Sequence, residues 1–448
     1  MDALPDPRAR LEAYARQNLP RYTSYPTAPH FGALDEAAYR AWLAAIRPGD
    51  TLSLYLHIPF CRELCWYCGC HTAITRNQAR LARYAAGLVA EAGLLAAALP
   101  ARSPVKSLHL GGGTPSAIGA KGLRQVMDRL RAAFAFQPGA ELSVELDPRT
   151  LGDDIANFLG AAGFTRASLG VQDMDPGVQA LIGRIQPAAQ VEGAVRRLRQ
   201  GGIRAVNFDL MYGLPGQDAA HVAASAGFAA EMGADRVAVF GYAHVPWMKP
   251  HQKAIAEDML PDAPARMEQA EAAEHALLGA GYVAIGLDHF ARPEDPMARA
   301  MQAGVLQRNF QGYTTDRAPV LLGLGASAIG ALPQGYAQNL PEERAWLAAV
   351  EAGRLPVGRG LLLTEEDRTR RAIIEAVMCD LELDLARVPD AVWRSAEPRL
   401  APLLADGLAT LADGKLKVTA TGRRFVRHVA SCFDARLGAA PARHSSAV

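Results

Sequence analysis

Short apolar runs alternate with longer amphipathic segments between about residues 50 and 285 of the 448-residue chain. We expect six strands, at residues 51–58, 105–110, 141–146, 167–171, 205–210 and 236–240. Helical patterns lie between them, at residues 80–99, 123–134, 151–162, 188–200 and 220–232. Six β-then-α units in series predict a parallel sheet, and they are too few to close an eight-fold barrel. The predicted fold class is therefore α/β, with a partial (βα)6 barrel.

The segments that flank this repeat differ from it. Residues 1–50 contain an aromatic and proline-rich stretch, RYTSYPT, at residues 21–27. A loop-rich section is expected at residues 288–339, a helix at 365–379 and a short strand at 415–418. We therefore expect an N-terminal segment (1–50) that serves as a lid, a barrel with its extension (51–340), and a small, mainly helical C-terminal domain (341–448).

Charge and hydropathy limit the partners of the chain. Lys and Arg number 47 and Asp and Glu 46, so there is no basic field that would favour nucleic acid. The N-terminus has no apolar core typical of a signal peptide. The longest apolar run, at residues 85–100, is interrupted by Glu91 and Gly93 and is too short to span a membrane. We expect a cytoplasmic protein, a monomer that contacts neither membrane nor nucleic acid.

Four of the six cysteines lie within ten residues, directly after the first predicted strand. Cys61, Cys65 and Cys68 have the spacing C-x3-C-x2-C, and Cys70 follows two residues later. Three thiolates in one loop can hold zinc or an iron–sulfur cluster. Zinc needs a fourth ligand, and Cys70 is cramped in that role. A cluster on three cysteines leaves one iron open to a small chelating ligand, so iron–sulfur is the favoured interpretation over zinc or structural thiols.

Other chemistry-bearing residues follow the later strands. A glycine-rich stretch, GGGTP at residues 111–115, follows the second strand and exposes main-chain N–H and C=O groups to a ligand. A phosphate-binding loop is the competing interpretation, but no Gly-Lys-Ser/Thr follows. Glu145, Gln172 and Asp209 end the third, fourth and fifth strands, and Arg184 follows the fourth. Each alone is more often a helix cap, but together on one face they indicate a site.

The cysteine spacing, the aromatic Tyr67 before the last cysteine, and the glycine-rich stretch together resemble the radical S-adenosylmethionine superfamily. The resemblance implies that Cys61, Cys65 and Cys68 bind a 4Fe–4S cluster. The open iron of such a cluster chelates S-adenosylmethionine, and one electron cleaves that molecule to methionine and a 5′-deoxyadenosyl radical.

A narrower resemblance covers nearly the whole chain. It is carried by RYTSYPT, by CGC at residues 68–70, YAH at 242–244, DHFARP at 288–293 and RNFQGYTT at 308–315. These stretches are similar to those of the oxygen-independent coproporphyrinogen III oxidase family. The resemblance implies oxidative decarboxylation of two propionates of coproporphyrinogen III to vinyl groups, giving protoporphyrinogen IX in haem biosynthesis. It also implies an electron donor such as a flavodoxin or ferredoxin.

The resemblance further implies two bound molecules of S-adenosylmethionine. The residues that match contacts to the first are Tyr55, Gly112, Glu145 and Ile329. Those that match contacts to the second are Tyr67, Gly113, Thr114, Gln172, Arg184, Asp209 and Ala243.

The remaining candidates concern the substrate. We hypothesise that Cys70 lies near it and is needed for turnover, against the alternative of a buried thiol. Candidate cations for its propionates are Arg21, Arg292 and Arg308, against the alternative that each forms a surface ion pair. His289 is either structural or a substrate contact. Cys379 and Cys432 are expected in the core.

Two other functions are less favoured. A non-catalytic haem-binding protein of the same family would lack CGC, RYTSYPT and RNFQGYTT, all of which are present. An iron–sulfur electron carrier has no need of the large β/α body.

Overall fold

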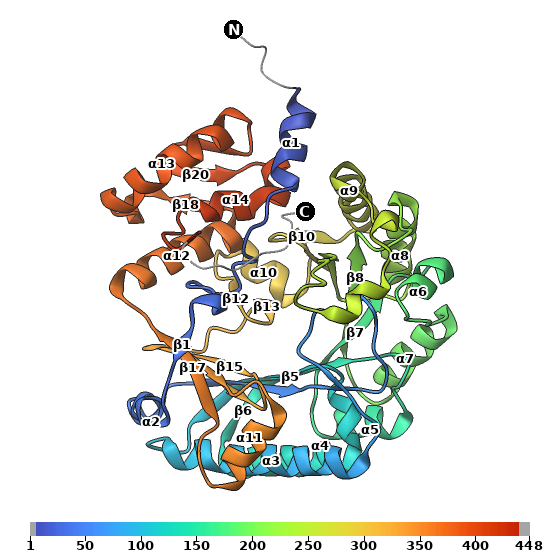
Figure 1. Ribbon diagram of the computed structural model, residues 1–448, viewed down its shortest axis with the longest axis vertical. Coiled ribbons are helices and arrows are strands. Elements are labelled where there is room, and N and C mark those ends of the chain that lie inside the picture. Colours follow the sequence, from blue (N-terminus) through green and yellow to red (C-terminus); the bar gives the residue numbers. More distant parts are fainter. Residues whose placement is uncertain (1–5, 439–448) are drawn as a thin grey trace.

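The structure is a computed structural model that describes residues 6–438 (Figure 1). Six parallel strands stand in sequence order at the centre of one large sheet. They are β2 (Leu52–Ile58), β5 (Pro104–Gly112), β6 (Ala135–Leu146), β7 (Arg166–Gln172), β8 (Ala205–Tyr212) and β9 (Arg236–Gly241). The predicted α/β fold with a partial (βα)6 barrel is confirmed.

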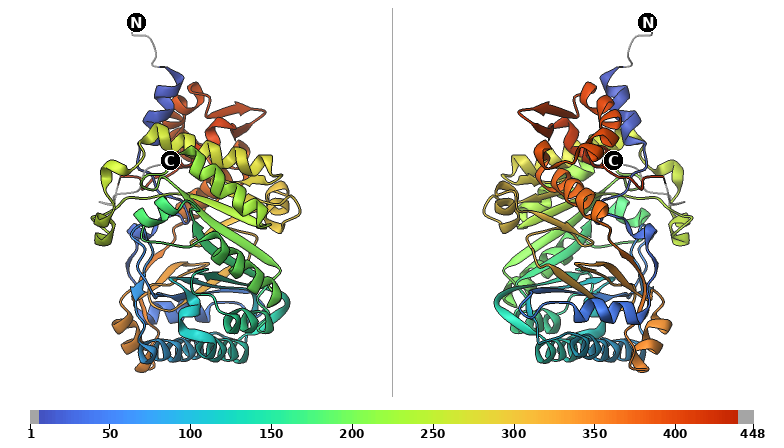
Figure 2. Two further views of the ribbon diagram at one scale, coloured as in Figure 1. Left: turned by 90° about the vertical axis from the view of Figure 1, so that its right-hand side faces the viewer. Right: turned by 90° about the vertical axis from the view of Figure 1, so that its left-hand side faces the viewer.

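Helices cover the outer face of these strands, as Figures 1 and 2 show. The connections contain α3 (Gln78–Ala98), α4 (Gly119–Ala133), α5 (Asp153–Ala161), α6 (Pro176–Leu181), α7 (Ala188–Gln200) and α8 (Ala219–Glu231), and α9 (Ala263–Gly279) follows β9. Leu54, Leu108, Val144, Leu169 and Phe208 come from successive strands and are buried in one hydrophobic core with these helices. Alternate strand residues share a face, so this apolar set turns outward together.

The opposite face of the same strands is polar. Ser53, His109, Ser143, Ser168 and Asn207 line a cavity of about 210 Å³ inside the barrel. The charged groups there are paired: Asp295, at the start of α10 (Pro296–Gln302), lies 2.8 Å from Arg236 and 3.4 Å from Arg166. The alternation of the strands therefore separates a dry outer core from a polar interior.

Further strands extend the sheet beyond the six. β14 (Val320–Leu324) runs parallel to β2, and the antiparallel strands that continue this side are β15 (Ile329–Leu332), β16 (Gly335–Asn339), β17 (Val357–Leu362) and β1 (Gly32–Ala33). At the other edge lie β11 (His289–Ala291) and β10 (Val283–Ile285). The section expected to be loop-rich thus also contains several strands, including the hairpin of β12 (Gln307–Asn309) and β13 (Gly312–Thr314). Its glycines permit close strand contact: a Cβ on Gly330 would stand 2.7 Å from the carbonyl oxygen of Leu321.

The C-terminal part packs at one end of the sheet, next to α1 (Pro7–Ala15) (Figures 1 and 2). It contains α12 (Glu365–Asp380), α13 (Asp390–Ala405), α14 (Val426–Ser431) and a small sheet of β18 (Glu382–Asp384), β20 (Lys415–Val418) and β19 (Ala409–Ala412). The predicted helix and terminal strand are both present. Tyr22 and Tyr25 of the N-terminal segment are buried in the same hydrophobic cluster.

The proposed division of the chain at residues 50 and 340 stays a prediction. Three elements outside residues 51–340 contact the barrel part. α2 (Glu36–Ala44) and α11 (Glu343–Glu351) each pack against α3. β17, which lies beyond residue 340, belongs to the large sheet.

Among the described residues, α3 is the one helix long and apolar enough to cross a membrane by length and composition. Its residues Leu81, Tyr84 and Leu88 are buried in the core, and the helix contacts α4 and α11. A core helix of this kind passes the same test, so it is weak evidence for a membrane span.

A buried carboxylate in α3 ties this helix to the far side of the sheet. Glu91 accepts hydrogen bonds from the Gly325 N–H (2.7 Å), the Asn339 amide (2.6 Å) and the Trp346 indole (3.0 Å). Burial nevertheless raises the pKa of Glu91 to about 7, above the ordinary value of 4.5. The folded chain therefore binds this proton more tightly than the unfolded chain does, and the contribution of Glu91 to stability falls as the pH rises from 4.5 to 7.

We expect Glu91→Gln to remove this pH dependence. Relative to the variant, the wild-type protein should lose about 2.5 kcal/mol of unfolding free energy between about pH 5 and pH 8, because ionisation of a buried carboxyl is costly. Denaturant unfolding at a series of pH values measures the difference. A wild-type–variant difference that is constant over this range would contradict the prediction.

Candidate active site

The cysteine loop lies at the carboxyl end of β2, where the parallel strands open. A short parallel pair, β3 (Phe60–Cys61) and β4 (Ala73–Ile74), closes the base of this loop. All four clustered cysteines line a cavity of about 540 Å³. Cys65 is buried, Cys61 and Cys68 are half-buried, and Cys70 is exposed to the cavity. The loop therefore presents its sulfur atoms to one open space.

Positive charge and hydrogen bonds surround the thiols. Arg184 and Arg149 each have a guanidinium nitrogen close to the Cys65 sulfur, at 3.4 and 3.5 Å. A hydrogen bond with Cys70 lowers the pKa of Cys68 to about 6, whereas burial raises the pKa of Cys61 to about 11. Nearby cations favour the thiolate, and a bound metal deprotonates a ligating thiol outright.

This donor set fits a 4Fe–4S cluster. In the part of the chain that the structure describes, no three His, Cys, Asp or Glu side chains meet closely enough for one metal ion. Three thiols that face one cavity without meeting at a point suit a cluster in which each thiolate binds a different iron. Cys61, Cys65 and Cys68 would be its ligands.

Asp147, directly after β6, holds both arginines that approach Cys65. Its carboxylate lies 2.7 Å from Arg149 and 3.3 Å from Arg184. Although burial acts in the opposite direction, these two arginines keep the pKa of Asp147 below its ordinary value. Asp147 and Arg149 were not expected as site residues. The sequence feature that could have identified them is their position directly after the third predicted strand, where Asp147 lies two residues beyond Glu145.

The glycine-rich stretch binds the cysteine loop through its main chain. The N–H groups of Gly113 and Thr114 donate to the carbonyl oxygens of Ile58 (2.9 Å) and Phe60 (2.8 Å). A Cβ on Gly113 would stand 2.8 Å from the Phe60 oxygen, and Gly112 has a φ of +117°. Side chains at these two positions would push the two loops apart, so the glycines are required for the close approach.

Glu145 on β6 and Asp209 on β8 both line the cavity, and their pKa values are shifted in opposite directions. Glu145 accepts hydrogen bonds from His109 (3.0 Å) and the Gly112 N–H (3.0 Å). Against the effect of burial, these partners keep the pKa of Glu145 below its ordinary value. Burial raises the pKa of Asp209 to about 6, and Ser168 donates to it at 3.1 Å. Glu145 is thus an ionised acceptor at neutral pH, suited to an ammonium or hydroxyl group. His109 was missed by the sequence analysis.

Most of the predicted site residues lie together. With the four cysteines, the larger cavity is lined by Tyr67, Gly112, Gly113, Thr114, Glu145, Gln172, Arg184, Asp209 and Ala243. Tyr55 lines the adjoining barrel cavity, which shares Glu145 and Asp209 with it, and its hydroxyl lies 3.0 Å from His57 Nδ1. Ile329 lines neither cavity: it packs on β15 against the cluster of Phe31 and Tyr336. The structure brings the residues together, and their individual roles stay predictions.

The substrate candidates separate into two groups. Arg21 lines the larger cavity, and Arg308 donates to the Arg21 carbonyl oxygen at 3.2 Å. Arg292 lies elsewhere, with its guanidinium 4.2 Å from the ring centre of Tyr282. His289 lines the barrel cavity and lies 2.7 Å from the carboxylate of Asp288. Cys379 and Cys432 are buried in hydrophobic clusters, as expected.

A segment after β9 holds the main chain of the cysteine loop from the other side. The Gln252 amide donates to the Tyr67 carbonyl oxygen at 2.9 Å, and His251 donates to that of Cys68 at 2.7 Å. Lys249 donates to the Cys70 carbonyl oxygen, also at 2.7 Å. Gln252 is fully buried. No local pattern in the sequence reveals these contacts, because the partners are about 180 residues apart.

Models of known protein families match two parts of the chain, one in the barrel and one in the C-terminal part. Residues 55–229 match the model of the radical SAM superfamily, and residues 363–425 match that of the HemN C-terminal domain. An oxygen-independent coproporphyrinogen III oxidase from Bradyrhizobium diazoefficiens is 48% identical over 97% of this chain and 98% of that relative. One from Paracoccus denitrificans is 45% identical over 96% of each chain.

A solved structure of a protein with a similar name also resembles this chain. The coproporphyrinogen III oxidase HemN of Escherichia coli, described as a radical SAM enzyme, superposes with a TM-score of 0.88 at 37% identity. The match covers 94% of this chain and all of that one. The chain belongs to the family of oxygen-independent coproporphyrinogen III oxidases, within the radical S-adenosylmethionine superfamily.

Proposed function

We propose that this chain catalyses the oxygen-independent oxidative decarboxylation of two propionate side chains of coproporphyrinogen III. The products are two vinyl groups and two molecules of CO2, and the tetrapyrrole becomes protoporphyrinogen IX in haem biosynthesis. One observation carries the proposal: three thiols, a glycine-rich main chain and the carboxylates of successive strands converge on one cavity, in a chain 48% identical to a relative named for this reaction.

The superfamily implies a 4Fe–4S cluster and S-adenosylmethionine, and Cys61, Cys65 and Cys68 would hold the cluster. When bound, these groups supply a 5′-deoxyadenosyl radical that removes a hydrogen atom from the β-carbon of a propionate. The propionate then loses CO2 and one electron, which passes to an acceptor, and a vinyl group remains. Because two propionates react, two such events are needed for each substrate.

The chain's own contribution is binding and orientation. Ionised Glu145 offers an acceptor for the polar groups of S-adenosylmethionine, and Gly112, Gly113 and Thr114 line the same cavity. Arg149 and Arg184 place positive charge beside Cys65. Burial of these groups away from bulk water strengthens each interaction.

Two molecules of S-adenosylmethionine form part of the proposal. Tyr55, Gly112, Glu145 and Ile329 are assigned to the first, although Ile329 lies apart from the others. The second is assigned to other residues that line the same cavity: Tyr67, Gly113, Thr114, Gln172, Arg184, Asp209 and Ala243. The cavity of about 540 Å³ lies within the size range of small-molecule sites.

The electron donor, oligomeric state and location are also proposals. We propose a flavodoxin or ferredoxin as donor, a monomeric chain, and a cytoplasmic location. Leu64 and Trp66, which are 37% and 38% exposed, are the sequence neighbours of Cys65, and Leu64 lies at the rim of the cavity that it helps to line. Exposed apolar side chains next to the cluster ligands give a donor protein a surface on which to dock.

The activity is tested with the anaerobically reconstituted chain, dithionite, S-adenosylmethionine and coproporphyrinogen III. We expect protoporphyrin by chromatography and two molecules of 5′-deoxyadenosine per substrate, one for each propionate. Cys65→Ser, which removes a cluster ligand, should lose both products together with the visible absorbance of the cluster. Cleavage of S-adenosylmethionine that leaves the porphyrinogen unchanged would contradict the substrate assignment.

The second S-adenosylmethionine is tested by binding stoichiometry. Equilibrium dialysis of the reconstituted chain should give two molecules bound. Asp209→Asn should give one, because it removes a carboxylate that can accept from ribose hydroxyls. Asp413→Asn, in the exposed turn between β19 and β20, serves as the matched control and should bind two. A single molecule bound to the wild-type chain would refute this part of the proposal.

Cys70 is proposed to act on the substrate and not on the cluster. Cys70→Ser should keep the cluster absorbance while decarboxylation slows by about tenfold or more, the effect of one lost interaction with a charged group. Both quantities are measured on the same reconstituted sample. Full activity with an intact cluster would show that Cys70 is dispensable.

A further inference from the structure

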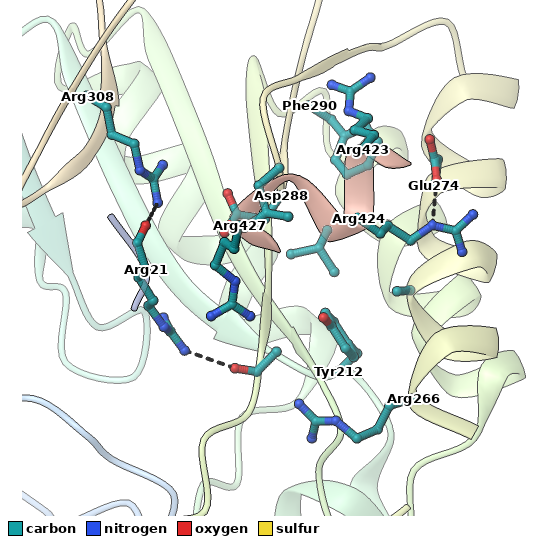
Figure 3. A pocket seen from close by; sticks show the side chains of 14 residues that line it. Arg21, Tyr212, Arg266, Glu274, Asp288, Phe290, Arg308, Arg423, Arg424 and Arg427 are labelled. Atoms are coloured by element: carbon teal, nitrogen blue, oxygen red, sulfur yellow. Dashed lines mark hydrogen bonds and ion pairs between the residues drawn. The ribbon is translucent and has the colours of Figure 1, made fainter. Parts of the chain in front are cut away.

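Arginines gather at two places next to the active site. One is a small cavity of about 60 Å³ that shares Arg21 with the larger cavity (Figure 3). The carboxylates of Asp288 and Glu274 line it among the arginines, and Glu274 lies 3.8 Å from Arg424. Positive charge in this small cavity therefore has carboxylates of the chain beside it. The other place is the wall of the larger cavity beside Cys65.

Each of the three proposed cluster ligands has a hydrogen-bond partner at its sulfur. The Thr114 hydroxyl lies 3.6 Å from the sulfur of Cys61, and the Thr72 hydroxyl lies 4.0 Å from that of Cys68. Cys65 differs, because its partners are two guanidinium groups, at 3.4 and 3.5 Å. A hydroxyl donates to sulfur without adding charge, whereas a guanidinium also brings a positive charge. Among the three ligands, Cys65 is therefore the one with cationic donors.

The two guanidinium groups differ in what the proposed function asks of them. Arg184 is assigned to the second S-adenosylmethionine, which gives a reason for its place in the cavity wall. Arg149 has no such assignment, although its side chain is only 11% exposed. Taking a cation out of water costs free energy, and an exposed position would avoid that cost.

Asp147 fixes the plane of the Arg149 guanidinium. Arg149 Nε lies 3.0 Å from Asp147 Oδ1, and Arg149 Nη2 lies 2.7 Å from Asp147 Oδ2. The Arg149 main-chain N–H also donates to Asp147 Oδ1, at 2.9 Å, and the Gln190 amide donates to the Arg149 carbonyl oxygen at 3.2 Å. Nη2 carries two hydrogens, so it donates one to Asp147 and the other to the Cys65 sulfur. The carboxylate thus directs one N–H of Arg149 to the sulfur.

Other charges near Arg149 leave this contact positive. The Glu63 carboxylate lies 3.8 Å from Arg149 Nη1, but it is 61% exposed and also pairs with Arg76 at 3.1 Å. Water screens a pair as exposed as this one. Asp147 is a single carboxylate that pairs with both guanidinium groups beside Cys65, so one positive charge is left in excess.

Hydrogen bonds to the ligand sulfurs and nearby charge are among the factors that set the reduction potential of an iron–sulfur cluster. Reduction adds one electron to the cluster and makes it more negative. An N–H bond to a ligand sulfur and a positive charge both stabilise this reduced state. The low dielectric of a buried site strengthens both effects. A donor therefore reduces such a cluster more readily.

We propose that Arg149 is a positioning residue that acts through Cys65. Held by Asp147, it donates a hydrogen bond to the ligand sulfur and raises the reduction potential of the cluster. The step that it assists is the transfer of one electron to the oxidised cluster from a low-potential flavoprotein or iron–sulfur protein. The donor loses that electron, the cluster gains it, and no bond forms or breaks. The inference rests on the cluster of the proposed function but not on the porphyrinogen substrate.

The test is a redox titration of the anaerobically reconstituted chain with titanium(III) citrate. Electron paramagnetic resonance measures the fraction of reduced cluster at each potential, and neither S-adenosylmethionine nor porphyrinogen is added. Arg149→Gln should reduce the equilibrium constant for reduction about tenfold, the effect of one lost hydrogen bond to a charged group. For a one-electron couple, this lowers the midpoint potential by about 59 mV. Arg149→Lys, which keeps the charge but not the planar fork, should fall between wild type and Arg149→Gln.

The matched control is Arg76→Gln. Arg76 and Arg149 both line a cavity of about 520 Å³ beside the cysteine loop, and both lie close to Glu63. The Arg76 side chain is 72% exposed and donates to Glu63, not to a sulfur. Arg76→Gln also removes one positive charge, but it should titrate at the wild-type potential because water screens that charge. Iron and sulfide analysis confirms that each variant holds the cluster.

The outcomes separate this inference from the proposed function. A wild-type potential in Arg149→Gln would show that Arg149 does not act on the cluster. Equal shifts in Arg149→Gln and Arg76→Gln would also overturn the inference, because they would reflect charge in general and not the bond to sulfur. Loss of the cluster from both Arg149 variants would overturn it as well, since Arg149 would then be needed to hold the cluster. If the potential falls as expected but the wild type forms no protoporphyrin, the inference stands and the proposed reaction does not.

Discussion

Every second residue of the six parallel strands faces the polar interior of the partial barrel, and the rest of the structure depends on this constraint. Polar groups in such a place must find partners, because an unpaired buried group costs free energy. The interior is accordingly paired: His109 with Glu145, Ser168 with Asp209, and Asp295 with two arginines. These contacts hold the carboxylates at fixed positions where the strands end. The positions of the site carboxylates therefore depend on hydrogen bonds and ion pairs inside the barrel.

The cysteine loop above this interior has little regular structure of its own. Its main chain is held by partners from several segments: the N–H groups after β5, the Ile182 carbonyl oxygen after α6, and side chains at residues 249–252. Each partner bonds to a different part of the loop. The loop is therefore placed by the complete fold, and a cluster would bind to thiols that already face one cavity.

Local signals explain which parts were predictable. The six strands, the cysteine spacing and the glycine-rich stretch are each encoded within about ten residues, so the sequence indicates them directly. β14 to β17 were missed because their glycines resemble loop residues, although these glycines allow close strand contact. Gln252 was missed because its partners are brought near only by the fold, and the contact of Asp147 with Arg184 depends on the fold in the same way. Ile329 lies away from the cavity for the same reason: its placement follows from strand pairing, not from its motif.

Where the N-terminal segment, the barrel and the C-terminal part meet, buried tyrosines determine the position of a charged side chain. Tyr22 donates to Asp434, and the Ala435 N–H donates to Tyr25, so both tyrosines are fixed in the C-terminal core. Arg21 immediately precedes Tyr22, and this anchoring brings its guanidinium to the border between the two cavities. Arg308 and Arg427 line the smaller of these cavities, from β12 and from the C-terminal part. The carboxylate of Asp288 lines the same cavity, and His289, together with the charges of Arg308 and Arg21, lowers its pKa. The anchoring of the two tyrosines in the C-terminal core therefore also fixes the position of Arg21 relative to this carboxylate, so packing in one part of the chain sets the electrostatics of another.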